Sequence, residues 1–183
     1  MLDAAAELLD RGGPDAVTLR QVGARAGVSR AAPYRHFADK EGLLTAIAVE
    51  SWDAMADDLE ADAALDAAPS ERLQRALMAL VELGRERPHL YQLMFVIPKH
   101  DPGAGARAAS RALDQFLSLV AAVVGEADAR RYGALLFSAA HGIAELEISG
   151  HLTQEKWQTT PEDLLAALVG IVDGQRPPAR RVP

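Results

Sequence analysis

The stretch TLRQVGARAGVSRAAPYRHFADKEGLL, residues 18–44, decides the fold of this chain. A helical pattern begins at Thr18, breaks at Gly27 and resumes around Pro33. Thr18 with Gln21 three residues later has the form of a capping box, in which side chains and backbone satisfy one another at a helix start. The stretch therefore predicts two short helices joined by a tight turn, and a longer helix after them.

The second of these short helices carries the unusual residues. We expect Ser29 to cap it and Phe37 to end it, which makes Pro33 its fourth residue. A proline there removes only the first intrahelical hydrogen bond and stiffens the start of the helix. Asp39 is expected to cap the next helix. Two short helices around a glycine turn form a helix-turn-helix, whose second helix enters the DNA major groove.

Charge is distributed unevenly along the chain. Residues 18–40 hold five cations and one acid, a net charge of +4, whereas the whole chain carries −7, so the remainder carries −11. Residues 41–71 contain no Lys or Arg. A basic patch on an acidic body suits a protein that meets a polyanion with one face. A chance run of solvated arginines is the alternative explanation.

Side-chain chemistry within the patch separates two kinds of contact. Arg30 on the leading turn can reach a guanine edge, and the small alanines that follow allow close approach to the bases. Tyr34, Arg35 and His36 offer donors to phosphates, and Lys40 at the start of the next helix can do the same.

Residues 2–48 resemble the TetR family of bacterial transcription regulators. The resemblance rests on the Thr cap, the Gly-Val-Ser turn, the Tyr-x-His-Phe segment and the Lys-Glu-x-Leu helix start. It implies that Thr18 also contacts phosphates, that residues 30–32 face bases, and that a homodimer binds double-stranded operator DNA. The candidate DNA-contacting residues are Thr18, Ser29, Arg30, Ala31, Ala32, Tyr34, Arg35, His36 and Lys40. Family members usually carry further residues before the first helix, so we expect a truncated or missing N-terminal arm.

The sequence as a whole predicts an all-α protein, because no window alternates apolar and polar residues. We expect a DNA-binding domain over residues 1–48, a larger helical ligand-binding and dimerisation domain over 49–175, and a disordered tail over 176–183. The expected elements of the larger domain are helices to residue 62 and over 70–87, 106–124, 128–151 and 160–173, a segment from Pro88, and one loop at 97–106. GAGARA, residues 103–108, mimics a dinucleotide fingerprint, but without a preceding strand it predicts a Gly-rich loop.

The second half resembles a subgroup of TetR-like C-terminal domains named for a Trp-His-Gly motif. The segments RERPHLYQLMF, residues 85–95, and AAHGIAELEISGHL, residues 139–152, carry the resemblance, with Ala140 where the tryptophan would stand. By analogy with the family, we expect a small, mainly apolar effector. Its candidate contacts are Tyr91, Met94, Phe95, Phe116, Phe137, His141 and Glu145, with Trp157 as a further aromatic.

Each of these residues has alternative explanations. Core packing accounts for any one of the aromatics. His141 and Glu145, four apart on a helix, suit a metal or acid–base site with His151, a hydrogen-bonded pair inside a bundle, or a ligand contact. No cofactor or metal site is predicted.

Two helices offer a dimer interface. The final helix has more apolar surface than one intramolecular contact needs, and the helix before it has a stripe of small residues. Two helices from each subunit would form a four-helix bundle with two-fold symmetry. The candidate interface residues are Ala139, Gly142, Leu146, Gly150, Leu164, Leu168, Ile171 and Val172.

These observations predict a cytoplasmic, non-enzymatic regulator, a repressor released from its operator by a ligand. The chain has no cysteine, no secretion signal and no run of about 18 apolar residues, so we expect no membrane partner. The alternative is a helical small-molecule-binding protein or enzyme that retains a vestigial helix-turn-helix.

Overall fold

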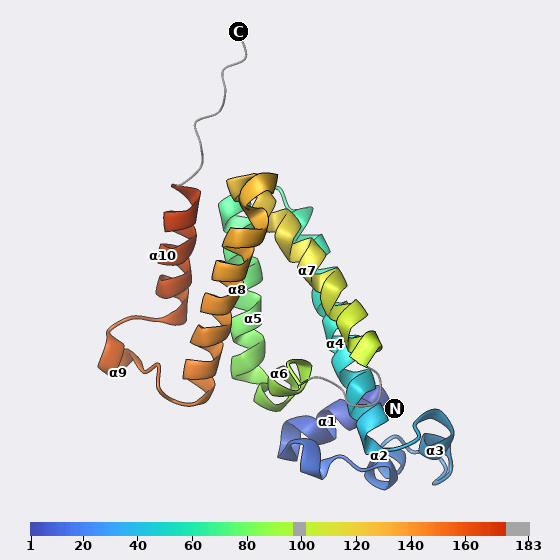
Figure 1. Cartoon of the computed structure of the whole chain (residues 1–183). Helices are drawn as coiled ribbons and strands as arrows, with labels where there is room; N and C mark the ends of the chain where they lie inside the picture. Colours follow the sequence, from blue (N-terminus) through green and yellow to red (C-terminus); the bar gives the residue numbers. More distant parts are fainter. Residues whose placement is uncertain (97–101, 175–183) are drawn as a thin grey trace. The chain divides into compact units, whose positions relative to one another are not determined.

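Helices make up the whole regular structure of residues 1–96 and 102–174, which are the residues that the computed structural model describes (Figure 1). No strand occurs in these two ranges, and the all-α prediction is confirmed. The chain divides into two compact units: the first holds Met1–Met55 and Glu86–Ala112, and the second holds Ala56–Arg85 and the chain from Leu113 onward. The predicted boundary at residue 48 stays a prediction, and the predicted tail lies outside the described residues.

The first unit is built around short N-terminal helices. It contains α1 (Leu2–Gly12), the 3-10 turn η1 (Pro14–Ala16), α2 (Leu19–Arg25), α3 (Ala32–His36), the first part of α4 (Lys40–Ala63), α6 (Pro88–Met94) and the start of α7 (Pro102–Val124). Its core comes from apolar positions one or two turns apart on these helices. The side chains that are at most 2% exposed there include Ala5, Leu9, Val17, Val22, Leu43 and Ile47.

Helix α6 packs onto the N-terminal helices of the same unit. The Trp52 indole Nε1 of α4 donates a hydrogen bond to the Met94 carbonyl, 3.1 Å away, and the Trp52 and Phe95 rings meet edge to face. Arg87, just before α6, pairs with Asp10 of α1 at 2.8 Å. Although it is far along the sequence, α6 is therefore part of the structure that supports the N-terminal segment.

The second unit consists mainly of long helices. It contains the end of α4, α5 (Pro69–Glu86), the second half of α7, α8 (Glu126–Ile148), α9 (Gln154–Trp157) and α10 (Pro161–Asp173). Figure 1 shows α10 running alongside α8. Thr160 and Asp163 form a full capping box at the start of α10, the helix that the sequence predicts from residue 160. Pro161, Leu165, Val169 and Val172 are the residues that α10 buries in its own unit.

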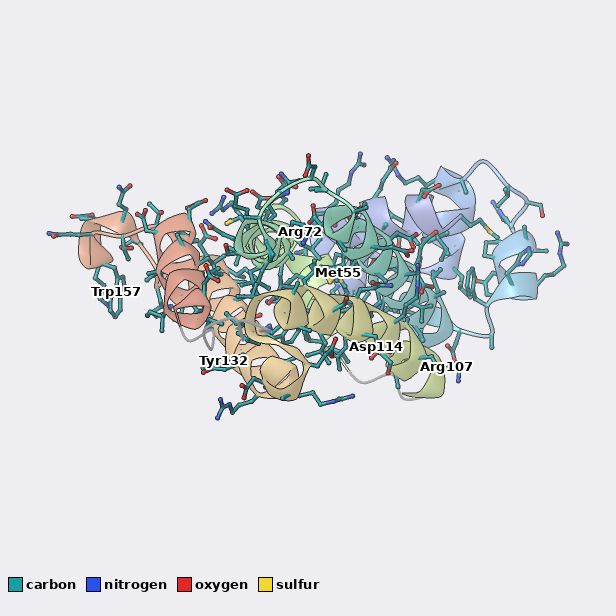
Figure 2. The ribbon with its side chains drawn as sticks, turned by 90° about the horizontal axis from the view of Figure 1, so that it is seen from above. Met55, Arg72, Arg107, Asp114, Tyr132 and Trp157 are labelled. Atoms are coloured by element: carbon teal, nitrogen blue, oxygen red, sulfur yellow. The ribbon has the colours of Figure 1, made fainter. Side chains whose placement is uncertain are left out.

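Two arginines of α5 offset the charge at the end of α4. The last turn of α4 contains acids and no basic residue, which is unfavourable at the negative end of a helix dipole. The Arg72 Nη1 donates to the Ala63 carbonyl at 2.6 Å, and Arg75 lies 3.2 Å from the Asp62 carboxylate. The positive charge missing from α4 is thus supplied by its neighbour (Arg72 is labelled in Figure 2).

Three sequence predictions about elements need correction. Residues 102–106 begin α7 instead of extending the loop, and the GAGARA segment lies on this helix, while 97–101 lie outside the described residues. Pro102 suits a first helical position, and the Ala-rich stretch after it tolerates single glycines at a cost of about 1 kcal/mol of stability each.

Helix α8 ends at Ile148 rather than at residue 151. The one-turn elements η1 and α9 were not predicted, since one turn shows no periodicity.

Candidate nucleic-acid interface and effector residues

The helices α2 and α3 pack against each other as a helix-turn-helix requires. Gly27 in the connecting turn has φ +67°, a conformation that favours glycine. A Cβ on Gly23 of α2 would lie 3.0 Å from the Pro33 Cγ of α3, closer than side chains normally approach. The Val28 N–H donates to the Gly23 carbonyl at 3.1 Å and closes the turn. Glycines at 23 and 27 therefore set the approach and the connection of the two helices.

The start of α2 is capped by Thr18, as predicted, but in a different arrangement. The Thr18 hydroxyl accepts a hydrogen bond from the Gln21 backbone N–H at 3.2 Å and donates its proton to the Gln21 side-chain oxygen at 2.7 Å. The predicted capping box instead had the Gln21 side chain bound to the Thr18 backbone N–H. A phosphate contact by the Thr18 hydroxyl would have to displace the Gln21 side chain.

Helix α3 starts later than predicted. Its first residue is Ala32, preceded by Ala31 without a side-chain cap, so the prediction that Ser29 caps it is wrong. The Ala32 N–H donates instead to the Ser29 backbone carbonyl at 2.9 Å. Pro33 explains the shift, because its fixed φ and missing N–H fit the first turn of a helix. Ser29 and Arg30 consequently lie in the turn that leads into α3.

Most of the predicted DNA-contacting residues lie on the surface. Tyr34 is 60% exposed, whereas Ala32 is only 8% exposed, so the Ala32 side chain packs inside the unit. Lys40 is half-buried at the start of α4. The exposed members of the set are Thr18, Ser29, Arg30, Ala31, Tyr34, Arg35 and His36.

The five cations of residues 18–40 fall into two groups. Arg25 pairs with Glu7 of α1, and the Lys40 Nζ lies 3.7 Å from Asp15 of η1. The other three are Arg20, Arg30 and Arg35, and within residues 1–96 and 102–174 no acid forms an ion pair with them. These three exposed guanidinium groups give the helix-turn-helix a positive surface that no described carboxylate neutralises.

The start of α4 is fixed by Asp39. Its carboxylate accepts a hydrogen bond from the Gly42 N–H at 2.8 Å, so the predicted cap is confirmed. This cap holds the backbone of Lys40, the first residue of α4.

The predicted effector residues belong to two different units. In the first unit Tyr91 is completely buried and Met94 is 5% exposed, and the rings of Tyr91 and Phe95 are 5.0 Å apart. In the second unit the rings of Phe116 and Phe137 are 6.1 Å apart. Core packing as the alternative explanation is therefore well supported for the aromatics Tyr91 and Phe116, and it extends to Met94.

Residues 141–157 include the remaining candidates for a polar site. His141 and Glu145 are both half-buried on α8. The Nδ1 of His151 is 3.0 Å from the Ser149 hydroxyl at the surface. Trp157 on α9 is 54% exposed and lies at the edge of the second unit in Figure 2, so it does not join the other aromatics. The described residues contain no group of three or more His, Asp or Glu that could hold a metal ion.

The predicted dimer residues lie mostly on the outer faces of α8 and α10. Ile171 is 66% exposed and Leu146 is 44% exposed, while a Cβ on Gly142 would meet no atom within 4 Å. Leu164, Leu168 and Ala139 are half-buried, and Gly150 follows the end of α8.

Two details of this surface differ from the sequence prediction. Val172 is only 1% exposed, because it lies on the same helical face as Leu165 and Val169 and packs into its own unit. Leu135, which is 52% exposed, continues the outer stripe one turn before Ala139 and was missed. Its spacing of four from Ala139 was the available signal.

An exposed glycine turn between two closely packed short helices, together with unpaired exposed cations among the described residues, defines a helix-turn-helix DNA-binding protein. A family model described as bacterial regulatory proteins, tetR family, matches residues 1–47. A second model, the tetracyclin repressor-like C-terminal domain, matches residues 73–172, more than half of the chain. The chain therefore belongs to the TetR family of transcription regulators. The likeness to the Trp-His-Gly subgroup stays a prediction.

Solved structures with the same fold cover nearly the whole chain. A protein of unknown function from Rhodococcus sp. RHA1 is 28% identical, with a TM-score of 0.77 over 94% of this chain and 91% of that one. The regulator SCO7222, a TetR from Streptomyces coelicolor, is 19% identical, with a TM-score of 0.71 over 97% of each. FadR from Bacillus subtilis, solved with stearoyl-CoA, is 14% identical, with a TM-score of 0.63 over 95% and 96%. Comparison with curated proteins finds no match.

Across the parts of the chain that the structure describes, no single helix is long and apolar enough to cross a membrane. Helices α7 and α8 pass the test of length and composition only when they are taken together as a bent pair.

Proposed function

We propose that this protein is a homodimeric repressor that binds operator DNA and is released by a small, mainly apolar ligand. The observation that carries the proposal is the exposure of Arg30 and Arg35, both without an ion pair among the described residues, beside the α2–α3 turn. A cation left unpaired by its own chain gains most from a polyanion. As a regulator that binds DNA, the protein would act in the cytoplasm and would need no catalytic group.

The proposal assigns different roles to the exposed residues. Arg30 enters the major groove ahead of α3 and donates to a guanine, with the small Ala31 beside it. Tyr34, Arg35 and His36 donate to phosphates, as does Lys40 once it leaves Asp15. Ala32 is omitted from the base contacts because its side chain is buried.

The dimer supplies the geometry that a single helix-turn-helix lacks. Two recognition helices related by a two-fold axis contact half-sites about 34 Å apart, or a multiple of it. We place the dimer contact on the outer faces of α8 and α10, where Leu135, Leu146 and Ile171 are exposed. An interface of roughly 1,200–2,000 Å² is the size expected for a specific dimer.

The effector is proposed to be apolar because most of the candidate contacts are aromatic or methionine side chains. FadR, which shares this fold, holds stearoyl-CoA, so the fold is compatible with a long acyl chain. Phe116 and Phe137, with His141 and Glu145 on the same helix as Phe137, are the candidates in the second unit. To release DNA, the ligand must bind more tightly to a dimer whose helix-turn-helix units are wrongly spaced, since equal affinity shifts nothing.

The test compares Arg30→Ala with Lys40→Ala in a mobility shift on DNA from around the protein's own gene. Loss of Arg30 should reduce the free energy of operator binding by about 1–3 kcal/mol per half-site and make the protein less selective for the contacted base. Loss of Lys40 should weaken binding to all sequences and reduce the salt slope by about one counterion per half-site. Arg130→Ala, which removes an exposed arginine of α8, is the matched control and should change neither.

Two results would count against the proposal. If wild type and Arg130→Ala show no salt-sensitive DNA binding, the protein is not a DNA-binding repressor through this surface. If Arg30→Ala keeps the base preference of wild type, Arg30 does not contact bases. For the effector, a compound found by thermal shift must bind more weakly when operator is present, because coupling between two sites is reciprocal.

A further inference from the structure

One of the cations proposed to meet DNA is already engaged by an acid of its own chain. The Lys40 Nζ lies 3.7 Å from the Asp15 Oδ1, and the Asp15 side chain is fully exposed. The two residues are far apart in the sequence, but both belong to the first unit.

The segments that carry the pair are held by their own hydrogen bonds. Asp15 is the middle residue of η1, which is closed by the bond from the Val17 N–H to the Pro14 carbonyl at 3.1 Å, and Val17 is completely buried. Lys40 follows the Asp39 cap. The local backbone of both segments therefore keeps the Asp15 carboxylate close to the Lys40 ammonium group.

We propose that Asp15 competes with DNA phosphate for Lys40 and so lowers the affinity of the protein for all DNA. This inference rests on the proposed function, in which Lys40 contacts a phosphate. A phosphate that approaches Lys40 must displace the carboxylate and also meets its negative charge, since like charges at this distance repel. Asp15 thus limits binding without touching a base.

The expected size of the effect follows from the exposure of the pair. Lys40 is 38% exposed and Asp15 is fully exposed, so water and salt screen their interaction strongly. Removal of the Asp15 charge should therefore tighten DNA binding about two- to five-fold per half-site at low salt, and less at high salt. Because phosphate contacts carry no sequence information, operator and unrelated DNA should gain equally. The salt slope should steepen by up to about one counterion per half-site.

The experiment uses the full chain with the variants Asp15→Asn and Asp15→Glu, alone and in a Lys40→Ala background. Asp15→Glu keeps the negative charge and should bind like wild type. Glu155→Gln, at an exposed position on α9 of the second unit, makes the same change in net charge and should leave binding unchanged. Each protein is titrated against operator and unrelated duplexes at several salt concentrations, and is also eluted from heparin, a sulfated polyanion.

The proposal expects Asp15→Asn to bind both duplexes more tightly, to elute from heparin at higher salt, and to lose both gains in the Lys40→Ala background. It is overturned if Asp15→Asn elutes with Glu155→Gln, or if the gain persists unchanged without Lys40, which would mean general repulsion. Failure of the two ideas can be told apart. DNA binding that is indifferent to Asp15 refutes the competition alone, whereas the absence of DNA binding in wild type refutes the proposed function and, with it, the competition for DNA, whatever the elution from heparin.

Discussion

Two surfaces of this protein are largely uncovered within residues 1–96 and 102–174, and their chemistry differs. The helix-turn-helix surface exposes charged and polar side chains, among them Arg30 and Arg35. The outer faces of α8 and α10 expose Leu135, Leu146 and Ile171. Arginines that are exposed to water cost the fold little free energy in the absence of a ligand. Burying an aliphatic side chain of the size of Leu or Ile, in contrast, contributes about 1.5–3 kcal/mol. We infer that the first surface suits a reversible partner and the second a lasting one.

The largest effect should come from placing charge on the apolar surface. The double substitution Leu146→Glu and Ile171→Glu should turn dimers into monomers. Two aliphatic side chains lost from each subunit represent about 3–6 kcal/mol per subunit, and the dimer dissociation constant should rise about 100-fold or more. Sedimentation at micromolar concentration measures this. We choose these residues over Leu168, which is half-buried, so that the fold of the subunit is preserved.

The control for this experiment is Leu65→Glu, which charges a leucine that is 40% exposed in the turn after α4. This variant should stay dimeric. If the double variant also stays dimeric, the interface lies elsewhere, and the contrast between the two surfaces loses its basis.

An intermediate effect is expected from a pair of glycines: Gly23, which is buried between α2 and α3, and Gly142 on α8. Gly23→Leu would press against Pro33, and overpacking of this kind costs about 1–3 kcal/mol. Its melting temperature should fall and its DNA binding should be lost. A Cβ on Gly142 would have open space around it among the described residues, so Gly142→Leu, a better helix former, should stabilise the subunit by up to about 1 kcal/mol. It should nevertheless weaken the dimer.

Thermal unfolding measures the stability of the two glycine variants, and sedimentation measures how tightly they dimerise. If Gly142→Leu dimerises as tightly as wild type, small residues on α8 are not needed for close approach of the partner. A Gly23→Leu protein that binds DNA normally would show that α2 and α3 tolerate a wider separation.

The smallest effect concerns how α10 is attached to its own unit. Arg85 of α5 lies 2.9 Å from Glu147 of α8 and 3.3 Å from Glu162 of α10. The pKa of Glu162 is lowered from its ordinary 4.5, mainly by a hydrogen bond from its own backbone, with help from the Thr160 hydroxyl and Arg85. A carboxylate with a lowered pKa stabilises the fold above its ordinary pKa and loses this contribution as the pH falls through the lowered value.

Wild type should therefore lose slightly more stability than Glu162→Gln between pH 5 and pH 3, where acids of this type titrate. Chemical denaturation of the two proteins at matched pH values measures the difference, which should be small because Glu162 is half exposed. Parallel stability profiles would contradict a role for the Glu162 charge.

Local capping signals made much of the fold predictable. Thr18, Asp39 and Thr160 cap helices as their sequence context predicts, because a cap involves only residues two or three positions apart. The start of α3 was harder to predict because Ser29 and Pro33 favour different first residues, and the proline decided. When two nearby residues favour different helix starts, the sequence pattern does not show which of them determines the first helical residue.

Long-range contacts were beyond prediction. The direction of Val172 depends on where α10 touches its own unit, and an Ala- and Leu-rich helix offers two nearly equal stripes. The pairing of Lys40 with Asp15 joins residues that no periodic pattern relates. The exposure of Arg30 agreed with the sequence prediction, but its lack of an acidic partner among the described residues could only be seen in the structure.

The division of the chain has a consequence for building hybrid regulators. The chain leaves the first unit after Met55, returns at Glu86 and leaves again after Ala112. A transplant of the N-terminal segment alone would leave behind α6, and with it the partner of the Trp52 indole and the Arg87 that binds Asp10. A donor of DNA specificity would therefore have to contribute two separate pieces of sequence, and recombination that exchanged only the first would pass on an incompletely supported module.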